Sequence, residues 1–303
     1  MNRVRVLAHA KINLGLEVLG RRPDGYHEVR TVMQSVSLAD ELVMRHADSL
    51  TLQCDDPDLE VESNLVLRAA HALRDAAAMA TGGRGVLPGA TMMLRKRIPV
   101  ASGLGGASAD AAAALVGLAA LWQLRLSTAE LLPLASELGA DVPFFLIGGT
   151  VLATGRGDVV HTLPDIPPTW LVILVPPHSI SAKTAVAYQQ LTAAHWSRGL
   201  RTAQLAEAIS SGQPLRDDLL LNSFEAVADE LFPGLSSYRD AMLRAGCHAT
   251  HLSGAGPAIY GLFHSEAAAG VVAERLVRDG HSPFLVRTLQ GHEARPRPVL
   301  DDD

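Results

Sequence analysis

Basic segments and long apolar runs are both missing from this sequence. Its 303 residues carry 26 Lys and Arg against 32 Asp and Glu, a net charge of −6, with no polybasic block. Binding to nucleic acid regardless of base sequence needs such a block, so no nucleic-acid partner is expected. The longest apolar run, 111–121, is shorter than the ~20 residues that span a bilayer. Charged residues also interrupt the N-terminal stretch where a signal peptide would lie. We therefore expect a cytoplasmic protein with no membrane partner.

Cysteine and aromatic residues are scarce. The two cysteines, Cys54 and Cys247, form no CxxC pair, which excludes a disulfide framework and suits a reducing compartment. Aromatic residues make up 4% of the chain, whereas hydrophobic residues reach 48%. This balance favours a globular α/β or α+β protein over an all-β sandwich. A chain of this length can bury a large core, and two domains are expected.

Turn signals and apolar periodicity predict the order of the elements. Short apolar runs between turn residues predict strands over 4–18, 26–38, 41–54 (as a pair), 90–98, near 150, 170–175, 248–263 (two strands around a loop) and 283–288. Helical spacing and capping residues predict helices over 64–80, 108–122, 127–139, from 141, and over 182–192, 201–211, 222–245 and 265–279. A Gly-rich surface loop is expected over 81–88.

Glycine and proline cluster over 155–168, which predicts a domain boundary there. We expect an N-terminal domain over 1–158 and a C-terminal domain over 159–290. The remaining segment, 291–303, is charged and contains proline, so it is expected to be disordered.

One segment joins glycines to an expected helix start. It reads Pro99-Val100-Ala101-Ser102-Gly103-Leu104-Gly105-Gly106-Ala107-Ser108-Ala109-Asp110. Glycines let backbone N–H groups point into one concavity, and a helix N-terminus adds partial positive charge, so the segment suits phosphate. It lacks the Gly-Lys-Ser/Thr of a Walker A loop, and Ser108 replaces the third glycine of a dinucleotide fingerprint. The alternative is a tight strand-to-helix turn.

Three further features point to a shared cleft. A second glycine loop, Ser253-Gly254-Ala255-Gly256-Pro257, lies far from the first in sequence, and its alternative is a plain hairpin loop. Asp141 begins an expected helix, where the local dipole keeps a carboxylate ionised and able to accept a hydroxyl proton. It is otherwise an ordinary N-cap. Lys11 lies in an apolar strand, where it needs an acidic partner unless it is exposed.

Together these segments resemble the GHMP kinases, the family of galactokinase and of homoserine, mevalonate and phosphomevalonate kinases. The resemblance runs from Ala8 to about Arg287. The matching segments, in the family's order, are Ala10-Lys11-Ile12-Asn13-Leu14, Arg22-Pro23-Asp24-Gly25-Tyr26-His27, 98–110, Gly139-Ala140-Asp141-Val142-Pro143-Phe144 and Leu252-Ser253-Gly254-Ala255-Gly256-Pro257. The Arg22 to His27 segment is typical of members that phosphorylate a cytidine diphosphate-linked polyol in non-mevalonate isoprenoid synthesis.

The resemblance implies an α+β fold of two domains with the active site in the cleft between them. It also implies an ATP-dependent kinase, monomeric or homodimeric, with Asp141 as the base and Lys11 as its charge partner. The implied ATP-binding residues are Asn64, Lys96 and the segment from Pro99 to Asp110. The implied substrate-binding residues are Asn13, Tyr26, His27, Thr184, Tyr188, Gly254 and Gly256, with a cytosine stacked between the two tyrosines.

The Mg²⁺ ligands stay open. Many relatives carry Ser-Ser directly after Gly-Leu-Gly, where this chain has Gly106 and Ala107, so Ser108 and Asp110 are only candidates. Two other functions also stay open: another GHMP kinase such as homoserine kinase, and a non-catalytic nucleotide-sensing module on the same fold. A nicotinamide-dependent dehydrogenase is a third, weaker reading.

Overall fold

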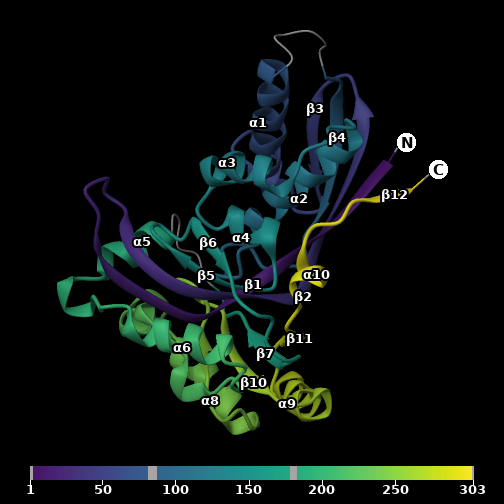
Figure 1. The fold of residues 1–303 in the computed structure, drawn as a ribbon. Coiled ribbons are helices and arrows are strands. Elements are labelled where there is room, and N and C mark those ends of the chain that lie inside the picture. The colour runs from purple at the N-terminus through teal and green to yellow at the C-terminus, as the bar shows by residue number, and fades with distance from the viewer. Residues whose placement is uncertain (1–2, 81–86, 178–182, 302–303) are drawn as a thin grey trace.

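The computed structural model describes residues 3–80, 87–177 and 183–301, and the predicted loop over 81–88 lies largely outside them. Two β-sheets carry the helices, which confirms the expected α+β class (Figure 1). The first sheet contains eight strands in the order β12-β1-β2-β4-β3, with β5 and β8 joined to β2 and β1, and β6 joined to β5. Their bounds are β1 Arg3–Arg21, β2 His27–Ala47, β3 Leu50–Cys54, β4 Gly89–Arg95, β5 Thr150–Thr154, β6 Val159–Thr162, β8 Leu221–Asn222 and β12 Val299–Asp301.

The second sheet has the order β11-β7-β10-β9. Its strands are β7 Trp170–Leu174, β9 His251–Leu252, β10 Ile259–Phe263 and β11 Phe284–Arg287. The helices are α1 Leu65–Ala80, α2 Gly106–Leu121, α3 Thr128–Leu138, α4 Val142–Ile147, α5 Lys183–Gln190, α6 Leu200–Ser210, α7 Ala228–Leu231, α8 Leu235–Ala245, α9 Glu266–Arg278 and α10 Gly291–Ala294. No helix formed by the described residues is long and apolar enough to cross a membrane.

Helix α2 lies deep in the first half because most of its residues have small side chains. Ten of its residues are alanine or glycine, counting Gly106 and Gly117. A Cβ on Gly117 would lie 2.0 Å from Met44 Cε of β2 and 3.0 Å from Val6 Cγ2 of β1, so any larger residue would require the Met44 side chain to move. The close packing fixes the N-terminal end of α2, from which the first glycine loop extends.

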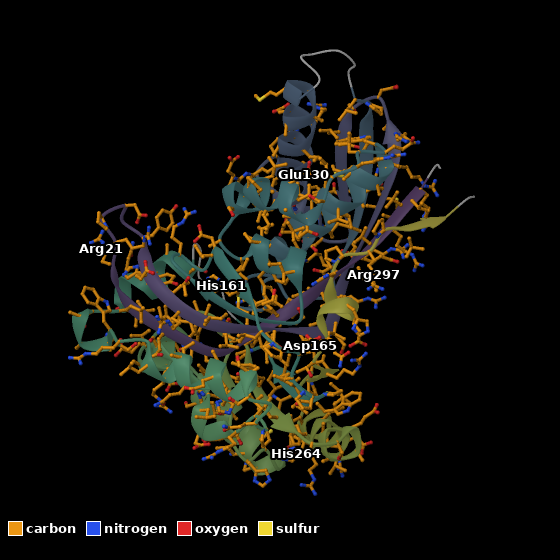
Figure 2. All side chains as sticks on the ribbon, viewed as in Figure 1. Arg21, Glu130, His161, Asp165, His264 and Arg297 are labelled. Atoms are coloured by element: carbon orange, nitrogen blue, oxygen red, sulfur yellow. The ribbon has the colours of Figure 1, made fainter. Side chains whose placement is uncertain are left out.

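One apolar cluster joins the two halves. It combines Ile12 and Leu14 of β1 with Ile173 of β7 and Tyr260 of β10, all of them buried. Polar side chains such as Arg21, Glu130 and His264 are exposed (Figure 2). The shared core explains how residues from both halves are held around one site.

The predicted boundary between residues 158 and 159 divides the antiparallel pair of β5 and β6. The C-terminal half also supplies β8 and β12 to the first sheet. The sheet therefore does not separate at that position, and the glycines near it, Gly155 and Gly157, form the turn between two paired strands.

Three element predictions are wrong. β2 is one strand of 21 residues rather than two, because its second half continues in register against β1 and β4. The single helix predicted over 222–245 is instead three elements, the 3₁₀ turn Ser223–Ala226, α7 and α8. Pro233 and Gly234 (φ +92°) separate α7 from α8. The tail is also ordered over residues 291–301, because β12 pairs with β1 and Glu293 of α10 forms a 2.6 Å ion pair with Arg287.

Candidate active site

A pocket of about 680 Å³ lies between the two halves of the chain. One side is formed by β1, the first glycine loop, and the starts of α1 and α4. The other side is formed by α5, the 3₁₀ turn containing Phe224, and Gly254. The predicted cleft therefore exists, and most of the predicted site residues line it.

The two glycine loops contact each other directly. The Ser253 hydroxyl donates to the Gly103 carbonyl over 3.0 Å, and the Ala258 N–H donates to the Ser102 carbonyl over 2.9 Å. A Cβ on Gly103 (φ +93°) would lie only 2.2 Å from the Ser253 carbonyl oxygen, so glycine is required for this contact. Between Pro99 and Asp110, only the buried Leu104 and Ala109 do not line the pocket.

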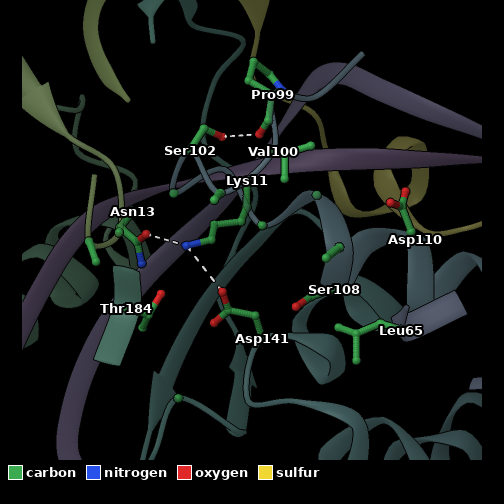
Figure 3. A pocket seen from close by; sticks show the side chains of 18 of the residues that line it. Lys11, Asn13, Leu65, Pro99, Val100, Ser102, Ser108, Asp110, Asp141 and Thr184 are labelled. Atoms are coloured by element: carbon green, nitrogen blue, oxygen red, sulfur yellow. Dashed lines mark hydrogen bonds and ion pairs between the residues drawn. The ribbon is translucent and has the colours of Figure 1, made fainter. Parts of the chain in front are cut away.

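Lys11 and Asp141 form an ion pair in the pocket. Lys11 Nζ lies 3.5 Å from Asp141 Oδ2, with side chains that are 5% and 38% exposed (Figure 3). Asp141 occupies the N-cap of α4 but makes no side-chain hydrogen bond to that helix. Its carboxylate is therefore available to the pocket, while the buried lysine has the acidic partner that the sequence required.

A chain of hydrogen bonds orients Lys11. Its ammonium donates to Asn13 Oδ1 over 2.7 Å, and Asn13 Nδ2 donates to the Thr31 hydroxyl over 2.8 Å. The Thr31 hydroxyl in turn donates to the Gly15 carbonyl over 2.7 Å. This last bond fixes which atom donates and which accepts in each of the three hydrogen bonds. Asn13, a predicted substrate ligand, thus uses both ends of its amide to position the lysine.

Asn64 and Lys96 also line the pocket. Asn64 caps α1, since its Oδ1 accepts from the Val66 N–H over 2.9 Å. The Lys96 ammonium lies between two carboxylates, 2.5 Å from Asp40 Oδ2 and 2.7 Å from Asp110 Oδ2. Burial lowers the pKa of Lys96, but the two carboxylates outweigh burial and raise it, so the ammonium stays charged.

Apart from Asn13, the predicted substrate-binding residues divide into two groups. Thr184, Tyr188 and Gly254 line the pocket, whereas Tyr26, His27 and Gly256 do not. The His27 ring stacks on Tyr188 with centroids 4.7 Å apart, which leaves no space for a base between them. Burial, with a smaller effect from Arg21, lowers the pKa of His27, so a neutral imidazole covers this face of Tyr188. The structure therefore does not display the predicted stacking site between the two tyrosines.

Sequence reasoning missed Arg156, which lines the pocket from the turn between β5 and β6. Asp158 accepts from its Nε and Nη2 over 3.1 and 2.6 Å, and its guanidinium lies 5.1 Å from the centre of the Tyr26 ring. The Gly155-x-Gly157 pattern is the available signal in the sequence, but together with the nearby prolines it predicts a domain boundary.

The pocket offers few metal ligands. Among the residues that the structure describes, no three His, Cys, Asp or Glu side chains could together hold a metal ion. Both candidates line the pocket, but Asp110 is already paired with the Lys96 cation. With so few protein donors, a Mg²⁺ ion would be held mainly through phosphate oxygens and water.

Comparison with known proteins matches two family models to the chain. The GHMP kinases N terminal domain matches residues 64–149, and the GHMP kinases C terminal model matches residues 201–282. The chain belongs to the GHMP kinase family. The predicted family and fold are thereby confirmed, and the N-terminal match includes the first glycine loop and Asp141.

Two relatives of this GHMP kinase are named 4-diphosphocytidyl-2-C-methyl-D-erythritol kinase. The protein from Dehalococcoides mccartyi is 41% identical over 285 residues, which cover 94% of this chain and 98% of that protein. The protein from Pelotomaculum thermopropionicum is 41% identical over 290 residues, with the same coverage.

Solved structures agree with this assignment. A crystal structure of 4-(cytidine 5'-diphospho)-2C-methyl-D-erythritol kinase is 36% identical, with a TM-score of 0.76, and the match covers 95% of this chain and all of that chain. Homoserine kinase from Cytophaga hutchinsonii has a TM-score of 0.72 at 20% identity, with 99% and 98% covered. The second likeness shows a common fold only.

Proposed function

We propose that this kinase transfers the γ-phosphoryl group of ATP to the 2-hydroxyl of 4-diphosphocytidyl-2-C-methyl-D-erythritol, in the non-mevalonate route to isoprenoid precursors. The observation that carries the proposal is the Lys11–Asp141 ion pair, which lies in one pocket with the first glycine loop. The names and near-complete coverage of the relatives at about 40% identity support the choice of acceptor.

In this reaction, Asp141 accepts the proton of the 2-hydroxyl as its oxygen attacks the γ-phosphorus. The new O–P bond forms as the bond to the β-phosphate oxygen breaks, and ADP leaves. Lys11 holds the Asp141 carboxylate in place and stabilises negative charge on the transferred group. The loop from Pro99 to Ala107 binds the phosphates through backbone N–H groups, helped by the N-terminus of α2.

Mg²⁺ belongs to the same proposal. When bound, it neutralises charge on the phosphate oxygens. The Ser108 hydroxyl is the proposed protein ligand, and the phosphates and water supply the others. Removing the metal with EDTA should abolish ADP release, and adding Mg²⁺ back should restore it.

Release of ADP with a panel of acceptors tests the function. The panel contains 4-diphosphocytidyl-2-C-methyl-D-erythritol, its uridine analogue, 2-C-methyl-D-erythritol phosphate and homoserine. We expect that only the first compound is phosphorylated at a substantial rate. Preference for homoserine would favour a homoserine kinase activity instead. This chain resembles the structure of one homoserine kinase with a TM-score of 0.72. ATP binding without any turnover would favour a sensing module.

We predict that His27 and Tyr188 distinguish the cytidine substrate from its uridine analogue. A site that hydrogen-bonds one base edge penalises the wrong base by about 2 kcal/mol, or about 30-fold in kcat/KM. His27→Ala should narrow this ratio, and Tyr188→Ala should lower kcat/KM for both substrates, because it removes the side chain that lines the pocket and packs against His27.

The control for this prediction is His264→Ala, because His264 is an exposed histidine that lies far from Arg21 and the hairpin between β1 and β2 (Figure 2). It should leave both rates unchanged. If His27→Ala lowers the unfolding temperature but keeps the cytidine-to-uridine ratio, the imidazole serves only to pack against Tyr188, and His27 leaves the site.

A further inference from the structure

Asn222 is a buried residue of β8, and both ends of its side-chain amide bind backbone groups near the pocket. Its residue surface is 7% exposed. Its Nδ2 donates to the carbonyls of Leu252 and Gly254 over 2.9 and 2.8 Å, and its Oδ1 accepts the N–H of Phe224 over 3.0 Å. One side chain thus joins β8 to the second glycine loop and to the 3₁₀ turn that carries Phe224.

Gly254 places the second glycine loop against the side chains that orient the catalytic pair. A Cβ on Gly254 would lie 3.4 Å from Lys11 Nζ and 3.5 Å from Asn13 Oδ1. On another side it would lie 3.1 Å from the Gly103 carbonyl oxygen. The loop is therefore packed against the first glycine loop and against the hydrogen bond from Lys11 to Asn13. A shift of Gly254 would change the space in which the Lys11 ammonium faces Asp141 (Figure 3).

The second sheet by itself does not hold this part of the loop. β9 is two residues long, and its pairing with β10 ends at Leu252, before Gly254. Asn222 supplies the hydrogen bond that the Gly254 carbonyl receives beyond that point. β8 in turn pairs with β1 at Leu16, so the loop is tied to the same strand that carries Lys11.

We propose that Asn222 is a positioning residue for phosphoryl transfer, since its amide holds the Gly254 carbonyl and so keeps the Lys11 ammonium in place opposite Asp141. Asn222 does not itself line the pocket, so it acts through Gly254 and not on the substrate. The inference rests on the proposed function, because it takes Lys11 and Asp141 as the catalytic pair.

Asn222→Asp tests the two donated hydrogen bonds. The variant keeps an oxygen that accepts the Phe224 N–H, and aspartate caps a helical turn as well as asparagine does. The carbonyls of Leu252 and Gly254 would lose their common donor and face a carboxyl group. We expect kcat to fall about 10- to 100-fold, because small displacements of catalytic groups have effects of this size. The KM for ATP should stay near that of the unaltered protein, since Asn222 makes no hydrogen bond to the first glycine loop.

Gln34→Glu is the matched control, because it makes the same change of amide to acid at a second buried bridge. Gln34 is fully buried, and its Nε2 donates to the carbonyls of Ser35 and Leu289 over 2.9 and 2.8 Å. It pairs with Ile12 on β1, so its side chain lies on the opposite face of the sheet from Lys11. This variant should lower the unfolding temperature but leave kcat unchanged. If Asn222→Asp does not fold, Asn222→Ser takes its place, since serine also caps the turn but has one hydroxyl proton for two carbonyls.

A double variant shows whether Asn222 acts through the orientation of Lys11. Asn13→Ala removes the acceptor that orients the ammonium, so adding Asn222→Asp to it should lower kcat much less than Asn222→Asp does alone. Losses that multiply, or an equal loss of kcat in Gln34→Glu, would mean that Asn222 only stabilises the fold. A raised KM for the acceptor with unchanged kcat would also overturn the proposal, because it would place the effect at Phe224. ADP release is measured with the acceptor that the unaltered protein phosphorylates fastest, so failure of the cytidine substrate would count against the proposed function alone.

Discussion

Asp141→Asn is expected to lower kcat by at least ~100-fold while ATP binding stays near that of the unaltered protein. The amide has the shape of the carboxylate but cannot accept the hydroxyl proton. Asp141 makes no side-chain hydrogen bond to α4, so the substitution removes no cap hydrogen bond. The buried Lys11 keeps its hydrogen bond to Asn13 but loses its acidic partner, so the unfolding temperature should fall while the protein stays folded.

Rapid-quench measurement of ADP formation, with titration of ATP, separates this effect from binding. Lys11→Met provides the companion variant, because Lys11 Nζ lies 3.5 Å from Asp141 Oδ2. If the two residues act as a unit, the double variant should be about as slow as the slower single variant rather than showing both losses multiplied. A near-normal kcat in Asp141→Asn would remove the carboxylate from the chemistry.

Local signals in the sequence were sufficient to locate most of the candidate site. Glycines before a helix, a carboxylate at a helix start and a lysine in an apolar strand each have a physical meaning that does not depend on the rest of the fold. The structure places Gly103, Lys11 and Asp141 around one pocket. Their roles in catalysis remain predictions that the variants above test.

The same local signals could not predict which residues pair across long distances in the sequence. Lys96 lies 56 positions from Asp40, and no periodicity connects them. The order of the tail could not be predicted for a similar reason. The tail is charged and irregular in sequence, and Val299–Asp301 forms a strand only because it pairs with β1. Pro233-Gly234, in contrast, is a local break that the helical spacing on either side obscured.

Gly105 joins the phosphate loop to the catalytic pair. It is the N-cap of α2 and has a φ of +77°, a conformation that residues with a Cβ adopt at a cost of about 1–2 kcal/mol. A Cβ there would lie 2.6 Å from Phe145 Cζ and 3.0 Å from Lys11 Cγ. Because Phe145 is buried in the core, the displacement would fall on the loop and on Lys11.

Gly105→Ala is therefore expected to lower kcat/KM for ATP by about 100-fold or more, since small displacements of reacting groups have effects of this size. Gly212→Ala is the matched control, because Gly212 has a φ of +69° with no atom within 4 Å of an added Cβ. It carries the same backbone strain without the contact, so it should reduce stability but leave kcat/KM unchanged. Titration should also show that Gly105→Ala weakens ATP more than the cytidine substrate. Equal losses for the two ligands, or similar kinetics in both variants, would mean that the loop has a structural role and does not bind the phosphates.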